Sequence, residues 1–116
     1  MGRNIRIAAA IKKEVGSIVQ YEIKDPRLGF VTITGCDVSP DLRQAKVFFS
    51  VLGDSKAHKD TRKALESALG FIRRLIGQRI RMRFTPQIHF REDKSSEYSI
   101  RIQEVLNELK EKDESK

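Results

Sequence analysis

Apolar residues recur at helical spacing in two parts of the chain. In residues 4–21 they fall on one stripe, and in residues 56–82 they form a longer stripe that Gly70 interrupts. A helix with one apolar face packs that face on a core, and a mid-helix glycine favours a bend or a break, so we expect a kinked helix pair. The stripes consist of Ile5, Ala8, Ile11, Val15, Ile18 and Val19, then Ala64, Leu65, Ala68, Ile72, Leu75, Ile76 and Ile80.

Three further segments alternate between apolar and polar residues, as strands do. Residues 30–39 alternate as far as Gly35, where the phase slips by one position, which predicts a β-bulge or strong local twist. Residues 44–52 follow after a short turn, so the two strands should form an antiparallel hairpin. Residues 87–91 form a short third strand.

Turn residues separate these elements and set their order. Asp25-Pro26 turns the chain after the first helix, and Thr85-Pro86 stops the second. Residues 98–109 carry one more apolar helical face, and residues 110–116 are charged throughout and should be frayed or disordered. The order helix, strand, strand, helix, helix, strand, helix predicts one domain over residues 1–109, a two-layer α+β sandwich with helices on one face of the sheet.

The charge balance narrows the possible partners. The 116 residues include 23 lysines and arginines against 16 acidic residues, a net charge of +7. This excess favours nucleic acid first and an anionic membrane surface second. A single cysteine, Cys36, excludes an intrachain disulfide, and no segment approaches the roughly 20 apolar residues that cross a bilayer. We therefore expect a soluble, cytoplasmic protein.

The sequence offers little for catalysis. Cys36 lies in a predicted strand, and His58 and His89 have no metal-ligand spacing with it. No glycine-rich phosphate loop with lysine and serine or threonine is present. We expect a binding protein that uses no cofactor and no metal.

The end of the kinked helix is rich in arginine. After Gly70 come Arg73, Arg74, Arg79, Arg81 and Arg83, and no acidic residue appears before Glu92. Guanidinium groups can bind phosphate in a bidentate manner and stack on bases, so this run could form a polyanion-binding face. It could equally be the solvated side of a core helix, and the run by itself leaves both readings open.

The order of elements resembles the type II KH fold, an RNA-binding module. Most KH domains join their central helices by a GxxG loop, whereas this chain has Ala68-Leu69-Gly70, which is similar to the kink of the bacterial ribosome-binding factor A family. The resemblance extends over about residues 3–109. It includes Asp25-Pro26-Arg27-Leu28-Gly29, Val31-Thr32-Ile33-Thr34, Val38-Ser39, Asp41-Leu42, Ala45-Lys46-Val47, Gly70-Phe71-Ile72-Arg73 and Pro86-Gln87-Ile88-His89-Phe90 followed by Asp93.

The resemblance implies a KH type II-like domain with an extra C-terminal helix, acting as a maturation factor for the small ribosomal subunit. Such a factor binds the free 30S subunit, assists late processing and folding of 16S ribosomal RNA, and supports growth in the cold. The resemblance also implies release with the help of an assembly GTPase. We expect a monomer.

The expected RNA contacts lie on several elements. The main patch should comprise Arg73, Arg74, Arg79 and Arg81. The kink should aim these groups, and the small Ala68 and Gly70 should allow close approach of an RNA backbone. Secondary candidates are Arg3, Arg6, Lys12, Lys13 and Arg27.

Three alternatives stay open at this point. A general KH-type protein could bind messenger or small RNA, although the missing GxxG loop argues against a single-strand clamp. A scaffold could bind a partner protein through the apolar face of its last helix. A membrane-surface role fits least, since the basic residues are spread over several elements without an apolar anchor.

Overall fold

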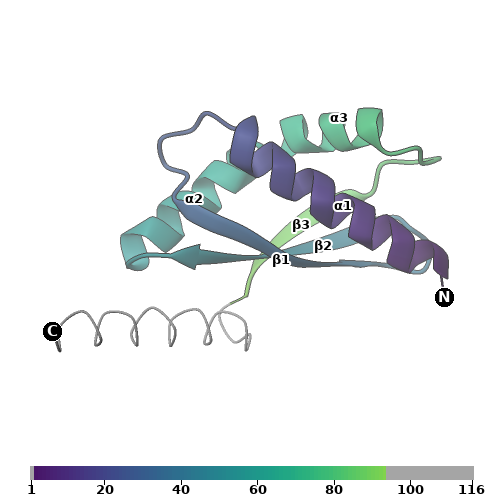
Figure 1. The fold of residues 1–116 in the computed structure, drawn as a ribbon, viewed down its shortest axis with the longest axis horizontal. Coiled ribbons are helices and arrows are strands. Elements are labelled where there is room, and N and C mark those ends of the chain that lie inside the picture. Colours follow the sequence, from purple (N-terminus) through teal and green to yellow (C-terminus); the bar gives the residue numbers. More distant parts are fainter. Residues whose placement is uncertain (1, 94–116) are drawn as a thin grey trace, which may run out of the picture.

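The structure, a computed structural model, describes residues 2–93 as three helices packed on a three-stranded sheet (Figure 1). Along the chain these are α1 (Gly2–Tyr21), β1 (Phe30–Val38), β2 (Gln44–Leu52), α2 (Ser55–Ser67), α3 (Leu69–Arg79) and β3 (Gln87–Glu92). The α+β class and the order of these six elements confirm the sequence prediction. The helix predicted at 98–109 and the charged segment at 110–116 lie outside the described residues.

The sheet has the order β1-β2-β3 and mixes both strand directions. β1 and β2 pair antiparallel as the predicted hairpin, and their register shifts between Ile33 and Gly35, where the sequence phase slips. β2 and β3 pair parallel, since α2 and α3 carry the chain back between them. The two edge strands are therefore β1 and β3.

One core lies between the helices and the sheet. Alternate residues of β2, from Ala45 to Val51, are buried, as the period of a strand with one covered face requires. Phe49 of β2 meets Phe90 of β3 edge to face, with ring centroids 6.2 Å apart. The helices contribute further fully buried apolar side chains, which include Ile11, Val15 and Ile18 of α1, Leu65 of α2, and Ile72 and Ile76 of α3.

The sequence left open whether the long helix bends or breaks at the Ala68–Gly70 kink, and it predicted helix to about residue 82. The structure shows a break there, since α2 ends at Ser67 and α3 begins at Leu69. Ala68 joins them with φ −88° and ψ 0°. Its N–H donates to the Ala64 carbonyl and its carbonyl accepts from Ile72, so both helices keep bonds to the joint. α3 then stops at Arg79, because Ile80 is already extended.

Candidate nucleic-acid interface

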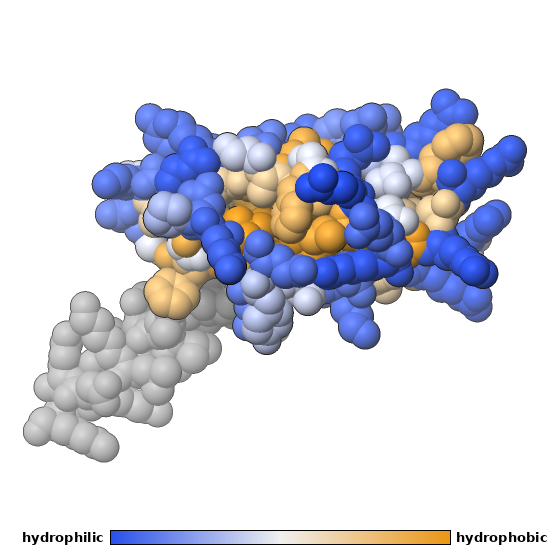
Figure 2. All heavy atoms as spheres, turned by 90° about the horizontal axis from the view of Figure 1, so that it is seen from above, coloured by the Kyte–Doolittle hydropathy of each residue, from blue (hydrophilic) through white to orange (hydrophobic). Residues whose placement is uncertain are grey.

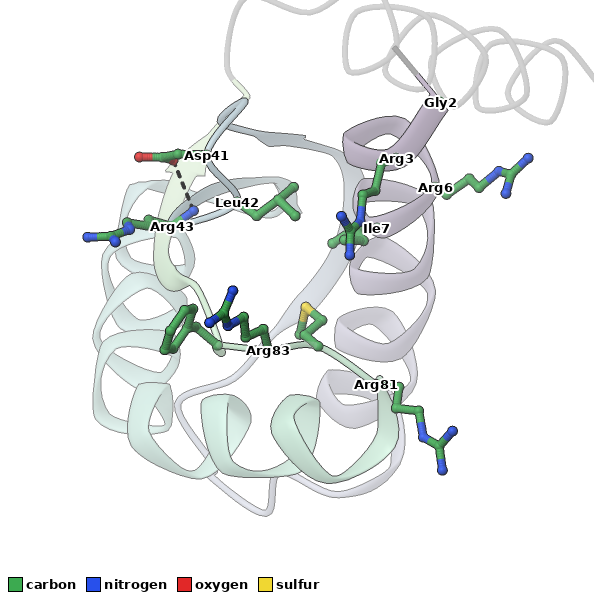
Figure 3. A pocket seen from close by; sticks show the side chains of 11 residues that line it. Gly2, Arg3, Arg6, Ile7, Asp41, Leu42, Arg43, Arg81 and Arg83 are labelled. Carbon is green, nitrogen blue, oxygen red and sulfur yellow. Dashed lines mark hydrogen bonds between the residues drawn. The ribbon is translucent and has the colours of Figure 1, made fainter.

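Three segments converge at one end of the molecule and enclose a groove of about 1050 Å³ (Figure 3). They are the first turns of α1, the turn between β1 and β2, and the connection between α3 and β3. Five arginines line the groove, which we call the arginine groove: Arg3, Arg6, Arg43, Arg81 and Arg83. No ion pair within residues 2–93 engages any of the five. The groove therefore keeps its positive charge.

The carboxylate of Asp41 also lines the groove, and it accepts hydrogen bonds from groups of its own turn. It accepts a hydrogen bond of 2.6 Å from the Ser39 hydroxyl and one of 3.1 Å from the Arg43 backbone N–H. The bond from Ser39, followed by that from Arg43, lowers the pKa of Asp41. The Asp41 carboxylate thus stabilises the turn. It forms no ion pair with the surrounding guanidinium groups in residues 2–93.

The groove combines these charges with apolar surface. Ile7, Leu42 and Met82 line it, and Phe84 beside them is 62% exposed. In Figure 3, Arg3, Leu42 and Arg83 point into the cavity, while Arg6, Arg43 and Arg81 point away from it. Cationic and apolar groups together suit a ligand with both phosphates and bases.

Two members of the expected main patch have partners inside the fold. Arg73 is half-buried, and its guanidinium group donates to the carbonyls of Thr85 and Pro86, each at 3.1 Å. Arg79 is exposed and pairs with Glu14 of α1 and with Glu22 directly after α1, and the hydrogen bond to Glu22 raises the pKa of Arg79. These two arginines hold elements together within the fold. Sequence reasoning missed this, because their partners lie 12 to 65 residues away.

The other two members of that patch are exposed but lie apart. Arg74 lies over the Phe71 ring on α3, with its guanidinium carbon 5.7 Å from the ring centroid. Arg81 follows the end of α3 and belongs to the arginine groove. The fold therefore does not gather the four predicted residues into one patch.

The joint between α2 and α3 is open to solvent on one side. A Cβ placed on Gly70 would meet no atom within 4 Å, and the half-buried Ala68 has no side-chain cap for α3. Uncapped N–H groups in a first helical turn can bind phosphate. The predicted close approach of RNA at Ala68 and Gly70 fits this geometry and stays a prediction.

The secondary candidates for RNA contacts lie in two separate hollows, except for one arginine that forms an ion pair. Arg3 and Arg6 join the arginine groove, whereas Lys12 and Lys13 line a separate hollow of about 1080 Å³ between α1 and β1. Arg27 pairs with Asp25 at 2.7 Å, and the hydrogen bond to Asp25 raises the pKa of Arg27. Arg27 is thereby partly neutralised on its turn.

Two groove residues were absent from the predicted site. Arg83 appeared only as part of the arginine run, and Arg43 in the hairpin turn carried no local signal. Only the approach of the hairpin turn to α1 and to the α3–β3 connection makes them neighbours. Within residues 2–93, no three histidine, cysteine or acidic side chains cluster as metal ligands, and no helix combines the length and apolarity of a membrane span.

The element order, the mixed sheet and the broken helix pair place this chain in the class of KH type II-like α+β domains. The model of the family described as ribosome-binding factor A matches residues 3–106, and the chain belongs to that family. This confirms the resemblance found in the sequence.

Two curated relatives named ribosome-binding factor A are similar over nearly the whole chain. The one from Halothermothrix orenii is 50% identical over 110 residues, covering 95% of this chain and 90% of its own. The one from Geobacter sulfurreducens is 44% identical over 107 residues, covering 92% and 91%.

Solved structures share the fold. A Thermotoga maritima protein assigned to ribosome binding factor A, determined by NMR in solution, is 35% identical with a TM-score of 0.71 and covers 83% of this chain and 92% of its own. The crystal structure of ribosome-binding factor A from Thermus thermophilus has a TM-score of 0.68 at 22% identity, covering 77% and 94%. A Thermus thermophilus RbfA homology model, fitted into a cryo-EM map of a 30S–RbfA complex, has a TM-score of 0.63 at 24% identity, covering 76% and 92%.

Proposed function

We propose that this protein is a maturation factor that binds the free 30S ribosomal subunit through its 16S RNA and assists late processing and folding of that RNA. Family membership supports the proposal, as does the 30S complex of the Thermus thermophilus relative. The observation that carries it is the arginine groove, whose five guanidinium groups have no carboxylate partner in the described part of the chain.

The mechanism follows from the charge of RNA. Each arginine that contacts a phosphate releases condensed counterions, which gives affinity without reading the sequence. A protein that binds one arrangement of folded RNA more tightly than others raises the population of that arrangement. The factor thus acts by preferential binding, and no bond is made or broken.

The proposal extends to the cellular setting. The protein works in the cytoplasm as a monomer, and an assembly GTPase promotes its release from the subunit. Stabilising one RNA fold matters most in the cold, where misfolded RNA escapes slowly, so loss of the protein should impair growth at low temperature more than at high temperature.

Sedimentation of the protein with ribosomal particles tests the proposal. In a sucrose gradient the wild type should travel with free small subunits and not with complete ribosomes. Charge reversal of two groove residues, Arg43→Glu with Arg83→Glu, should remove it from the small-subunit fraction. The matched control, Lys59→Glu with Arg62→Glu, changes the charge equally at exposed positions of α2 outside the groove and should still sediment with the subunits.

Two results would count against the proposal. A groove variant that sediments like the wild type would show that the arginine groove is not the contact. Crosslinking followed by RNA sequencing separates the general KH-type alternative, because recovery of messenger or small RNA in place of 16S RNA would support that reading.

A further inference from the structure

The turn between β1 and β2 contains a residue in an unfavourable backbone conformation. Leu42 has φ +63° and is the one residue other than glycine with positive φ in residues 2–93. A side chain with a Cβ is disfavoured in this region, and glycine normally takes this place in hairpin turns. Strained residues of this kind cluster at functional sites. The position of the Leu42 side chain therefore calls for an explanation.

Three hydrogen bonds within the turn hold Leu42 in place. Its N–H donates to the Ser39 carbonyl at 2.9 Å, and the next N–H, of Arg43, donates to the Asp41 carboxylate at 3.1 Å. The Gln44 N–H donates to the Ser39 hydroxyl at 3.0 Å. The outcome is that the Leu42 side chain points into the arginine groove (Figure 3).

Two guanidinium groups reach into the same cavity. Arg3 enters from α1 and Arg83 from the α3–β3 connection (Figure 3). The Arg83 guanidinium carbon lies 5.6 Å from the centroid of the Phe84 ring, a cation–π contact that orients it. Planar guanidinium groups stack on aromatic rings, so they can hold a flat heterocycle over an apolar floor.

The remaining arginines differ in direction. Arg6, Arg43 and Arg81 point away from the cavity on different sides of it (Figure 3). A phosphate alone would make no favourable contact with the apolar floor of the cavity. A nucleotide can place its base over this floor and its phosphate on the arginines around the cavity. Bases inside an A-form helix are stacked and out of reach of such a cavity, but an unpaired base can enter it.

We propose that the arginine groove takes one unstacked nucleobase of RNA, seated over Leu42 between Arg3 and Arg83, with the neighbouring phosphates on Arg6, Arg43 and Arg81. This rests on the proposed function, in which the partner is RNA, and it specifies the feature recognised. The factor would thus hold RNA that has a base out of the stack.

Three model hairpins test the proposal with the full chain. They share one stem, which is fully paired, or carries one bulged 2-aminopurine, or carries an abasic site at the bulge. Stacking on a base is worth about 1–3 kcal/mol, so the bulged RNA should bind about 5- to 150-fold more tightly than the abasic one at equal salt. The 2-aminopurine fluorescence should change on binding.

Two variants assign the effect to the pocket. Leu42→Gly relieves the turn and removes the floor, so it should lower the affinity for bulged RNA to that for abasic RNA. Arg3→Lys keeps the charge and removes the planar group, so it should reduce the preference while leaving the salt dependence unchanged. Arg62→Lys on α2 is the matched control and should keep the wild-type preference. Circular dichroism confirms the fold of each variant.

Equal binding of bulged and abasic RNA by the wild type, or a full preference in folded Leu42→Gly or Arg3→Lys, would overturn the proposal. So would failure to bind the bulged hairpin at a salt concentration where small subunits are bound. In these cases salt-sensitive sedimentation with small subunits would leave the proposed function standing. A bulge preference without any binding to small subunits would support the pocket and reject the proposed function.

Discussion

At the scale of single residues, two arginines that are adjacent in the sequence have different environments. Arg73 and Arg74 are adjacent in the sequence, yet Arg73 donates to two carbonyls of the α3–β3 connection and Arg74 is exposed over Phe71. Replacing both at once would mix an effect on folding with an effect on binding. Single substitutions separate the two.

Arg73→Ala should therefore lower the free energy of unfolding, while Arg74→Ala should not. Losing hydrogen bonds from a charged donor costs about 1.5–3 kcal/mol, and an exposed substitution changes stability by less than about 0.5 kcal/mol. Urea unfolding of the two variants measures the difference. Equal stabilities would show that the Arg73 bonds to Thr85 and Pro86 contribute nothing.

The thiol of Cys36 should be unreactive in the folded protein. Burial, with a smaller contribution from Asp37, raises the pKa of Cys36 from 9.0 to about 11. Only the thiolate reacts, so two pKa units mean about 100-fold slower alkylation near pH 8 than in the unfolded chain. Iodoacetamide labelling with and without urea measures the ratio, and the folded rate should rise about tenfold per pH unit up to pH 10. Comparable rates would contradict the burial.

At the scale of elements, the joint at Ala68 decides where the second half of the helix points. The glycine that drew attention in the sequence lies in the first turn of α3 and is exposed. The chain bends one residue before α3 begins, where an alanine keeps backbone bonds to both helices. The break itself therefore does not require Gly70. The feature of Gly70 that remains to be tested is the open space next to its Cα.

Gly70→Ala should stabilise the fold, because the new methyl group meets no atom within 4 Å and alanine favours helix by up to about 1 kcal/mol. Gly77→Ala gains the same propensity, but its Cβ would lie 2.8 Å from the Thr85 hydroxyl oxygen, so its gain should be smaller. Thermal unfolding ranks the two variants. A less stable Gly70→Ala protein would show that the joint does need glycine.

The same variant tests the predicted approach of RNA at this joint. If an RNA backbone lies against Gly70, the methyl group should weaken binding to small subunits although the fold is more stable. Unchanged binding would remove Ala68 and Gly70 from the interface.

At the scale of the whole molecule, the face seen from above has hydrophilic side chains around its edge and an apolar area in its middle (Figure 2). The net charge of +7 is not uniformly available, since Arg27 and Arg79 are held by acidic residues and the five groove arginines are not. Five arginines without a carboxylate partner in residues 2–93 therefore meet at one end of the molecule.

Affinity for small subunits should fall steeply with salt, and the groove should account for much of the slope. Phosphate contacts at Arg6, Arg43 and Arg81 predict a slope of about −2 to −3 in a plot of log affinity against log salt concentration. Replacing Arg43 and Arg81 with alanine should make it shallower by about 2 units, whereas Lys59→Ala with Arg62→Ala should leave it unchanged. Filter binding across salt concentrations measures this, and a flat wild-type response would indicate a protein–protein contact.

The sequence by itself determined the elements, the hairpin, the register slip at Gly35 and the family, because hydrophobic period and turn chemistry act over a few residues. It did not determine which arginines are available. The partners of Arg79 lie on α1 and directly after it, and Arg3, Arg43 and Arg83 come from three separate segments. Only the packing of α1 and α3 on the sheet decided which charges are neutralised and which meet around one groove, since Coulomb interactions depend on distance in space and not on separation along the chain.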